Sequence, residues 1–344
     1  MAATTNPRRR GGWLVDDLGA REPWRVPVPQ AVRDELAATA ARCPAPALGD
    51  GRVTHLPHTA RLARLVQERL ADPGFVVLSG LPVDDEETAL RVLWVLGRVL
   101  GRAVPQSRDG ALVGRVEDLG ADFDNPRHRG HKTSAALPFH VDRTDVIALL
   151  CVRAASNGGL SQLASAAAVH DVLLDESPDL LEELYAPLPH DRRGEESPGE
   201  APWCQVPVFS DVAGELVARY VRRFVEASQR HPAAPRLTPS QRAALDAVDD
   251  VLARPGTALS MDLRTGDLQL IHNFTILHAR SAFTGRDDGP GRLLLRLWLS
   301  SPRSPDLPHW FAPLYGSTAR GTVRGGVWPE GWSDVLGRPV EEIV

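Results

Sequence analysis

The stretch that decides the fold is residues 258–300, which read ALSMDLRTGDLQLIHNFTILHARSAFTGRDDGPGRLLLRLWLS. Short apolar runs alternate here with turn residues such as Gly, Asp and Asn, a pattern that is typical of strands. The expected strands are Ala258–Leu263, Asp267–Ile271, Thr275–Leu277 and Arg292–Ser300. Short strands joined by irregular connections favour a β-sandwich or a jelly roll.

Upstream of this stretch, further short strands are mixed with helices. Residues 74–82 (GFVVLSGLP) and 145–153 (DVIALLCVR) are apolar runs of strand length. Residues 58–71 carry apolar side chains at helical spacing, and residues 238–253 open on a Thr-Pro pair that suits a helix start. No GxGxxG motif follows a strand, which argues against a Rossmann fold. We therefore expect an α+β protein with a jelly-roll (double-stranded β-helix) core, helical insertions and flanking helices.

The length of 344 residues permits one large domain or two small ones. Residues 1–28 are rich in Pro, Arg and Gly, and we expect an irregular arm there, followed by a single domain at 29–344. Periodicity is lost near 105–138 and again at 187–203, where polar residues accumulate. Long loops inside a compact domain are often functional, so both segments are candidate lids.

Composition narrows the class of protein. The hydrophobic fraction of 43% and charged fraction of 24% are those of an ordinary globular protein. A formal charge of −5 gives no reason to expect nucleic acid or an anionic membrane as a partner. Cys43, Cys151 and Cys204 are too scattered for a disulfide framework, which favours the reducing cytoplasm. The N-terminus lacks the apolar segment of a secretory signal, and Arg8–Arg10 is expected to be a solvated tail.

A metal site is indicated by the segment Phe139-His140-Val141-Asp142. Residues i and i+2 of an extended segment point to the same face, so His140 and Asp142 can aim an imidazole and a carboxylate at one point. His278 closes a strand-like segment far downstream and offers a third ligand. Two imidazoles and one carboxylate leave open positions on a redox-active iron. By itself an HxD spacing is weak, because a surface hydrogen-bonded pair has the same pattern.

Four motifs, taken in order, resemble those of the taurine dioxygenase and clavaminate synthase-like superfamily. They are the strand at 74–82, LPFHVD at 137–142, NGGLS at 157–161 and the run from Gly266 to Arg296. The resemblance implies an oxygenase that uses Fe(II), 2-oxoglutarate and O2. Such an enzyme oxidises, most simply by hydroxylation, an unactivated C–H bond of a small substrate.

The resemblance also implies roles for single residues. His140, Asp142 and His278 would ligate the iron, and His278 is favoured over His272 because the family pattern Ala-Arg-Ser follows it. Related halogenases lack the carboxylate, so Asp142 argues for hydroxylation, desaturation or ring closure.

The 2-oxoglutarate anchor implied by the resemblance is Arg292, fourteen positions after His278. Ser161 stands where the family has a threonine hydroxyl that contacts the same carboxylate. Arg296 would grip an acidic group of the substrate or, equally, form a surface salt bridge. Arg280 is expected to brace the site.

Other polar residues near the motifs are interpreted more simply. Arg143 and Asp145 could orient the ligands or face solvent. His170, His190 and His309 are expected to be ordinary surface or hydrogen-bonded histidines.

Two other classes of protein stay open at this point: a metal hydrolase that uses the same ligands, and a non-catalytic jelly roll that binds a small molecule. The expected substrate is small and anionic or zwitterionic, such as an amino acid or an intermediate of natural-product biosynthesis. The sequence leaves the identity of the substrate and the oligomeric state open.

Overall fold

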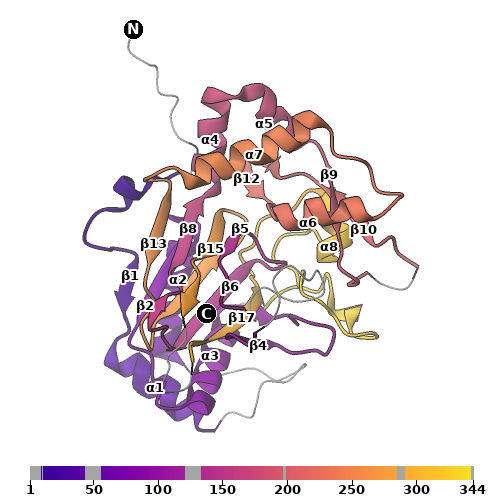
Figure 1. The fold of residues 1–344 in the computed structure, drawn as a ribbon. Coiled ribbons are helices and arrows are strands. Elements are labelled where there is room, and N and C mark those ends of the chain that lie inside the picture. Colours follow the sequence, from indigo (N-terminus) through magenta and orange to yellow (C-terminus); the bar gives the residue numbers. More distant parts are fainter. Residues whose placement is uncertain are drawn as a thin grey trace.

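The computed structural model describes residues 9, 11–42, 56–120, 133–196, 199–284 and 291–341. Two sheets form the centre of this part of the chain (Figure 1). The larger sheet has the order β1-β2-β14-β6-β17-β3, with β4 also paired to β17. Its strands are β1 (Arg25–Pro27), β2 (Phe75–Ser79), β3 (Arg102–Ala103), β4 (Val113–Val116), β6 (Val146–Arg153), β14 (Leu268–His272) and β17 (Leu293–Ser300).

The smaller sheet has the order β13-β8-β15-β5, and all its neighbouring strands are antiparallel. Its strands are β5 (Leu137–His140), β8 (Ser161–Ser165), β13 (Ala258–Met261) and β15 (Ile276–Arg280). The strands expected between residues 258 and 300 are therefore present, and they are divided between both sheets. β7 (Asn157–Gly158) and β16 (Phe283–Thr284) form a short ladder; in sequence, β7 precedes β8 and β16 follows β15.

The two faces of β17 explain why this strand is buried along its whole length. Leu295 and Leu297 belong to a cluster with the helices that cover the larger sheet. Leu294 and Trp298 point the other way and pack with Leu163 of β8 in a separate apolar cluster that joins the two sheets. Since side chains alternate along a strand, Arg296 lies on this inner face, between two apolar neighbours.

Helices α1 (Gln30–Ala40), α2 (Pro57–Ala71) and α3 (Glu86–Leu100) cover the outer face of the larger sheet. Helices α1 and α3 lie at the bottom of Figure 1. The predicted stripe on α2 is confirmed, because Leu62, Val66 and Leu70 are all buried. Asp85 caps α3 by accepting a hydrogen bond from the Thr88 backbone nitrogen at 2.8 Å.

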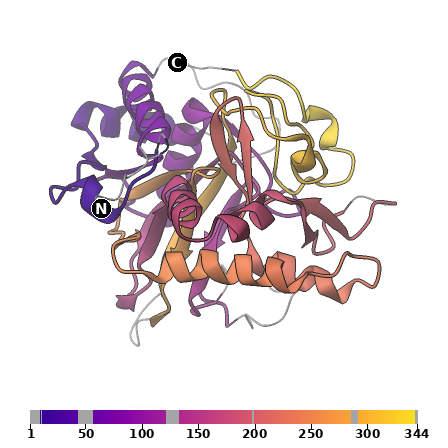
Figure 2. The same ribbon diagram turned by 90° about the horizontal axis from the view of Figure 1, so that it is seen from above.

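A second helical layer covers the smaller sheet. It consists of α4 (Ala166–Glu176), α5 (Pro178–Tyr185) and α7 (Pro239–Ala253), and Figure 2 shows α7 (orange) running along one side of the molecule. Thr238 begins α7 with a capping box to Gln241, as expected from the Thr-Pro pair. No helix within the described ranges is long and apolar enough to cross a membrane.

The chain between α5 and α7 forms an insertion that carries β9 (Leu188–Asp191), β10 (Trp203–Val206), β11 (Phe209–Val212), β12 (Glu215–Ala218) and α6 (Arg222–Ala227). The segment expected to be a polar loop at 187–203 therefore begins with a strand, and β9 pairs with β10. The segment near 105–138 likewise contains β4 and the start of β5, while residues 121–132 lie outside the described residues. Alternating polar and apolar residues in these short strands gave too little signal to separate them from loops.

The N-terminal segment is more ordered than its composition indicates. Among the described residues of the expected arm, Val15–Leu18 forms a 3-10 helix and β1 adds a parallel edge strand to β2. Arg9 forms ion pairs with Asp171 and Asp211, so it is not a free solvated side chain. Arg8 and Arg10 lie outside the described residues.

Candidate active site

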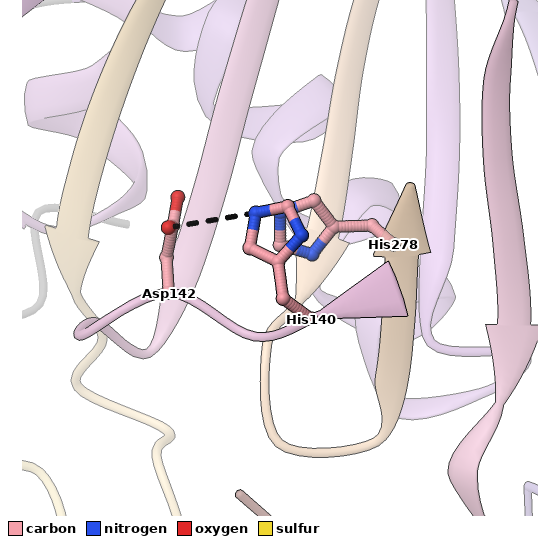
Figure 3. Close-up of side chains that lie close together, drawn as sticks. All are labelled: His140, Asp142 and His278. Atoms are coloured by element: carbon pink, nitrogen blue, oxygen red, sulfur yellow. Dashed lines mark ion pairs between the residues drawn. The ribbon is translucent and has the colours of Figure 1, made fainter. Parts of the chain in front are cut away.

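Strand register brings the predicted metal ligands together. In the pairing of β15 with β5, His278 stands directly opposite His140. The centroids of the two imidazole rings are 4.2 Å apart. Asp142 follows two residues after the end of β5, and its Oδ1 lies 3.9 Å from His140 Nε2 (Figure 3). One ligand atom from each of the three residues lies within 4.8 Å of the other two, which is close enough to share one cation.

The tautomer of His140 is fixed by its neighbour. Its Nδ1 lies 2.8 Å from the carbonyl oxygen of Pro138. Because a carbonyl can only accept a hydrogen bond, Nδ1 carries the proton. Nε2 therefore presents its lone pair on the side of Asp142, as a metal-binding imidazole must.

Asp142 is held so that one carboxylate oxygen is left for a cation. Its Oδ2 accepts hydrogen bonds from Arg296 Nη1 at 3.1 Å and from Trp298 Nε1 at 2.9 Å, both on the inner face of β17. Asn273 holds the backbone of the same residue, since its Oδ1 accepts from Asp142 N at 2.8 Å and its Nδ2 donates to Asp142 O at 2.7 Å. The side chain and the main chain of Asp142 are thus both anchored.

The protonation states suit a divalent cation. Burial lowers the pKa of His278 to about 3, with a further contribution from His140. Burial also lowers the pKa of His140. Burial alone would raise the pKa of Asp142, but Arg296 and the two imidazoles hold it below its ordinary value. At neutral pH the triad therefore offers two neutral imidazoles and one carboxylate, which are the forms that bind metals.

A cavity that we call the inner cavity opens beside the triad, between the two sheets. The triad and Arg296 line it together with Val116, Leu137, Ile147, Leu149, Ser161, Leu263, Ala279, Arg280, Arg292 and Leu294. The sequence singled out Ser161 and Arg292, and the fold brings both to this cavity. Ser161 Oγ donates to Gln269 Oε1 at 2.9 Å.

Arg292 has the free donors that an anion needs. It is buried, its guanidinium lies over the Phe283 ring at 5.0 Å, and its Nη2 lies 3.4 Å from the Gly159 carbonyl. Its Nη1 is buried and has no hydrogen-bond partner among the described residues. Burial lowers the pKa of Arg292 because the charge has left water. A carboxylate entering the inner cavity would supply the missing partner.

Arg280 lies beside Arg292, and the sequence predicted only a bracing role for it. Its Nη2 donates to the carbonyl oxygens of Thr133 and Ala135 at 2.6 and 2.5 Å, which is the expected bracing role. Its Nε and Nη1 are buried without a partner in the described part of the chain. Burial, and then the charge of Arg292, lower its pKa to about 10. Two neighbouring guanidinium groups thus face one small cavity.

A second cavity, which we call the arginine pocket, opens on the other side of His140 and Asp142. Its wall comes from the residues after Asp142, from β9 and the segment after it, from the end of β12 and from α6. The polar side chains used below are Arg143, His190, Arg192, Glu195 and Arg219. Leu137, His140, Asp142 and Arg296 line both cavities and form the wall that the two share, whereas His278 lines the inner cavity but not the arginine pocket.

Four other histidines named from the sequence lie outside the triad. His272 Nδ1 bonds to Thr275 Oγ1 at 3.0 Å, His170 bonds to Tyr185, and His309 stacks on Trp310. His190 is different, because it is buried in the arginine pocket with its Nε2 3.4 Å from Arg219 Nη2. Its position depends on the pairing of β9 with β10, and no sequence motif marked it.

Arg143 and Asp145 also have partners. Asp145 is fully buried in an ion pair with Arg324 at 2.6 Å, so it does not face solvent. Arg143 Nε donates to the Leu314 carbonyl oxygen, and its Nη1 lies 3.6 Å from Glu195. Arg296 is buried against Asp142 instead of forming a surface salt bridge.

Comparison with known proteins agrees with this geometry. Residues 45–298 match the model of the family described as "Taurine catabolism dioxygenase TauD, TfdA family". The chain belongs to the TauD/TfdA family. Members of this family are oxygenases that depend on Fe(II) and 2-oxoglutarate, and the chain is therefore such a dioxygenase, with O2 as its other co-substrate. This excludes the hydrolase and the non-catalytic binding protein.

Two curated relatives are similar in sequence to this TauD/TfdA-family dioxygenase. It is 31% identical over 310 residues to FR-33289 synthase of Streptomyces rubellomurinus, covering 87% of this chain and 91% of that protein. It is 28% identical over 205 residues to a uridine-5'-phosphate dioxygenase of Amycolatopsis sp, covering 56% of this chain and 73% of that protein.

Among solved structures, an asparagine oxygenase bound to Fe(II), 3-hydroxyasparagine and succinate superposes with a TM-score of 0.61 at 23% identity. The match covers 80% of this chain and 93% of that one. The mixed α/β fold is thus the fold of known non-haem iron oxygenases.

Proposed function

We propose that His140, Asp142 and His278 hold the iron of this dioxygenase. The observation that carries the proposal is the triad itself, with one ligand atom from each residue within 4.8 Å of the others. Asp142 keeps Oδ1 for the metal because Arg296 and Trp298 occupy Oδ2. Two imidazoles and one carboxylate on one side of an iron leave the opposite positions for 2-oxoglutarate and O2.

Arg292 would bind the distal carboxylate of 2-oxoglutarate in the inner cavity. A guanidinium can meet a carboxylate with two parallel hydrogen bonds, and Arg292 has a buried nitrogen to spare. Ser161 would turn its hydroxyl from Gln269 to the same carboxylate. Arg280, which also has unpartnered nitrogens in the described part of the chain, would add charge from the adjacent side.

The proposed reaction is hydroxylation of an unactivated C–H bond. Bound iron would supply the activation of O2, and the reaction converts substrate, 2-oxoglutarate and O2 into hydroxylated substrate, succinate and CO2. The chain's own residues orient the reactants and keep water away from them. The substrate would enter from the arginine pocket, because 2-oxoglutarate is proposed to occupy the inner cavity.

The substrate is expected to be small and anionic or zwitterionic. An amino acid or a natural-product intermediate fits this description, and the comparisons include an asparagine oxygenase and a uridine-5'-phosphate dioxygenase. A direct contact of Arg296 with substrate stays a prediction. Since Arg296 is bound to Asp142 Oδ2, its first contribution would be to hold that carboxylate.

The eight strands β4, β5, β6, β8, β13, β14, β15 and β17 would form the double-stranded β-helix. The support is their pairing, with β4-β17-β6-β14 in one sheet and β5-β15-β8-β13 in the other, so that most chain-neighbouring strands lie in opposite sheets. A single domain at 29–344, lids near 105–138 and 187–203, and a cytoplasmic location stay predictions.

An anaerobic titration tests the proposed function. Adding Fe(II) and 2-oxoglutarate together should give a visible charge-transfer band that neither gives alone. Under air, succinate should form from 2-oxoglutarate, and candidate substrates should accelerate it. A protein that binds no iron, or that gives no band with both ligands, would show that the triad has another role.

A further inference from the structure

The arginine pocket carries more positive charge than a simple substrate cavity requires. Of the twenty residues that line it, seven are Arg and three are Asp or Glu, an excess of four positive charges. Part of this charge is neutralised from outside. Arg222 pairs with Glu226, Asp246 and Asp249, and Arg192 pairs with Glu200; none of these four acids lines the pocket. Asp191, one of the three acids, is in turn paired with Arg230 at 2.7 Å.

Arg219 is the charge best placed to meet a ligand. It is 4% exposed and follows directly after β12. Its Nη1 donates to the carbonyl oxygens of Val141 and Asp142 at 2.7 and 3.2 Å, which fixes the guanidinium beside the triad. Its Nε is buried without a hydrogen-bond partner, and the partners of its other nitrogens among the described residues are two carbonyl oxygens and His190. A buried charge without a counter-ion is costly unless a ligand supplies one.

Arg192 and Arg143 lie on the same wall. Arg192 Nη2 pairs with Glu200 at 2.5 Å, but its Nε is buried and has no partner in the described ranges. Arg143 lies 3.6 Å from Glu195, beyond hydrogen-bond distance. His190 sits among these groups, and burial, followed by Arg219 and Arg143, lowers its pKa well below the ordinary value. Because a guanidinium can only donate, His190 Nε2 accepts from Arg219, and the neutral imidazole is left with its Nδ1–H as a donor to a ligand.

We propose that the arginine pocket binds a substrate through a tetrahedral dianionic group, a phosphonate or a phosphate monoester, held by Arg143, Arg192 and Arg219. This inference rests on the proposed function, because it names the substrate class for the same triad. Three guanidinium groups from three separate segments match three oxygen atoms, whereas a carboxylate offers two. A phosphate-type group carries about −1.5 to −2 charges at pH 7, which suits the excess positive charge better than a single negative charge.

The geometry also sets which end of the substrate reacts. Since His140 and Asp142 form one wall of the pocket, an anion fixed on the arginines would direct its carbon chain toward the triad. The group itself is not altered, because the reaction exchanges a C–H bond for C–OH. The arginines would act as positioning residues that fix which carbon faces the metal.

Calorimetry with simple probes tests the inference on the full chain loaded with Fe(II) and 2-oxoglutarate without O2. The probes are propylphosphonate, propyl phosphate, propane-1-sulfonate and butyrate, which separate charge from shape. Either dianion should bind at least about tenfold more tightly than the sulfonate or butyrate. Tighter binding of propylphosphonate assigns the C–P class, and tighter binding of propyl phosphate assigns the ester class. Equal binding of all four probes would overturn the proposal.

Two variants locate the binding. Arg192→Gln and Arg219→Gln should each weaken propylphosphonate binding by about 10- to 100-fold, as expected for a lost hydrogen bond to a charged group. Arg254→Gln is the matched control, because Arg254 pairs with Glu176 at the surface and does not line the pocket, so this variant should bind propylphosphonate with unchanged affinity. Arg219 also supports the backbone of Asp142, so Arg219→Gln could weaken Fe(II) binding as well. If it does, the result for Arg192→Gln alone decides the anion-binding question.

Fe(II) binding and dianion binding are separate readouts, so an error in the substrate class can be told apart from an error in the triad assignment. If Fe(II) and 2-oxoglutarate bind but no dianion does, the substrate class is wrong and the triad stands. If dianions bind the metal-free chain on these arginines but Fe(II) does not bind, the triad assignment is wrong and the anion site stands.

Discussion

The inner cavity and the arginine pocket share one wall but are built differently. The inner cavity takes its polar residues from the strands of both sheets or from positions directly beside them: Ser161 on β8, Arg280 on β15, and Arg292 just before β17. The arginine pocket takes them from the ends of β9 and β12 and from the residue after Asp142. A strand fixes its side chains by register, whereas insertions are where related proteins vary most. The difference teaches that the cavity proposed for the co-substrate is fixed by strand register, whereas the cavity proposed for the substrate is built from an adjustable insertion.

A substitution at Asp142, which lines both cavities, should reduce activity most. Asp142→Ala deletes the one carboxylate of the triad, and we expect loss of Fe(II) binding and of all 2-oxoglutarate-dependent oxygenation. Calorimetric metal titration and succinate release measure this. Asp175→Ala, at an exposed carboxylate on α4, is the control. Full hydroxylase activity in Asp142→Ala would contradict the ligand assignment.

The next largest effect should be confined to the inner cavity. Arg292→Ala removes the counter-ion proposed for the distal carboxylate, and the apparent KM for 2-oxoglutarate should rise at least about 30-fold, as for loss of a buried charge partner. Binding of propylphosphonate should be unchanged, because Arg292 does not line the arginine pocket. If the KM is also unchanged, the anchor moves to Arg280 or Arg296, which line the same cavity.

The converse variant probes the other cavity. Arg192→Gln should leave the apparent KM for 2-oxoglutarate within about twofold of its original value, because separate sites contribute independently. Uncoupled succinate formation without substrate measures this, and the dianion affinity should fall at the same time. A parallel loss of 2-oxoglutarate affinity would mean that the two cavities act as one site.

The smallest effect should come from Trp298, whose Nε1 donates to Asp142 Oδ2. Trp298→Phe removes this hydrogen bond and keeps an aromatic ring, so Fe(II) affinity should fall by only about two- to tenfold. Trp298 also lines the arginine pocket, where Phe keeps an aromatic wall. Metal titration measures the Fe(II) affinity, and an unchanged affinity would contradict the role of this hydrogen bond.

Sequence patterns predicted much of this arrangement. Alternation of side chains put His140 and Asp142 on one face, and the spacing of the final strand put Arg292 and Arg296 on one side of it. The motif after His278 separated it from His272, and the fold leaves His272 bonded to Thr275 instead. These features are local, so a short stretch of sequence suffices to indicate them.

What the sequence by itself determined is the set of short strands, the ordered motifs of the family, and the residues that those motifs single out. Tertiary structure alone decided that His278 stands opposite His140, that Arg296 and Trp298 hold one oxygen of Asp142, and that the arginines at 143, 192 and 219 line one pocket. The physical reason is distance along the chain. Strand register and the packing of insertions depend on hydrogen bonds and contacts between segments that no local periodicity records.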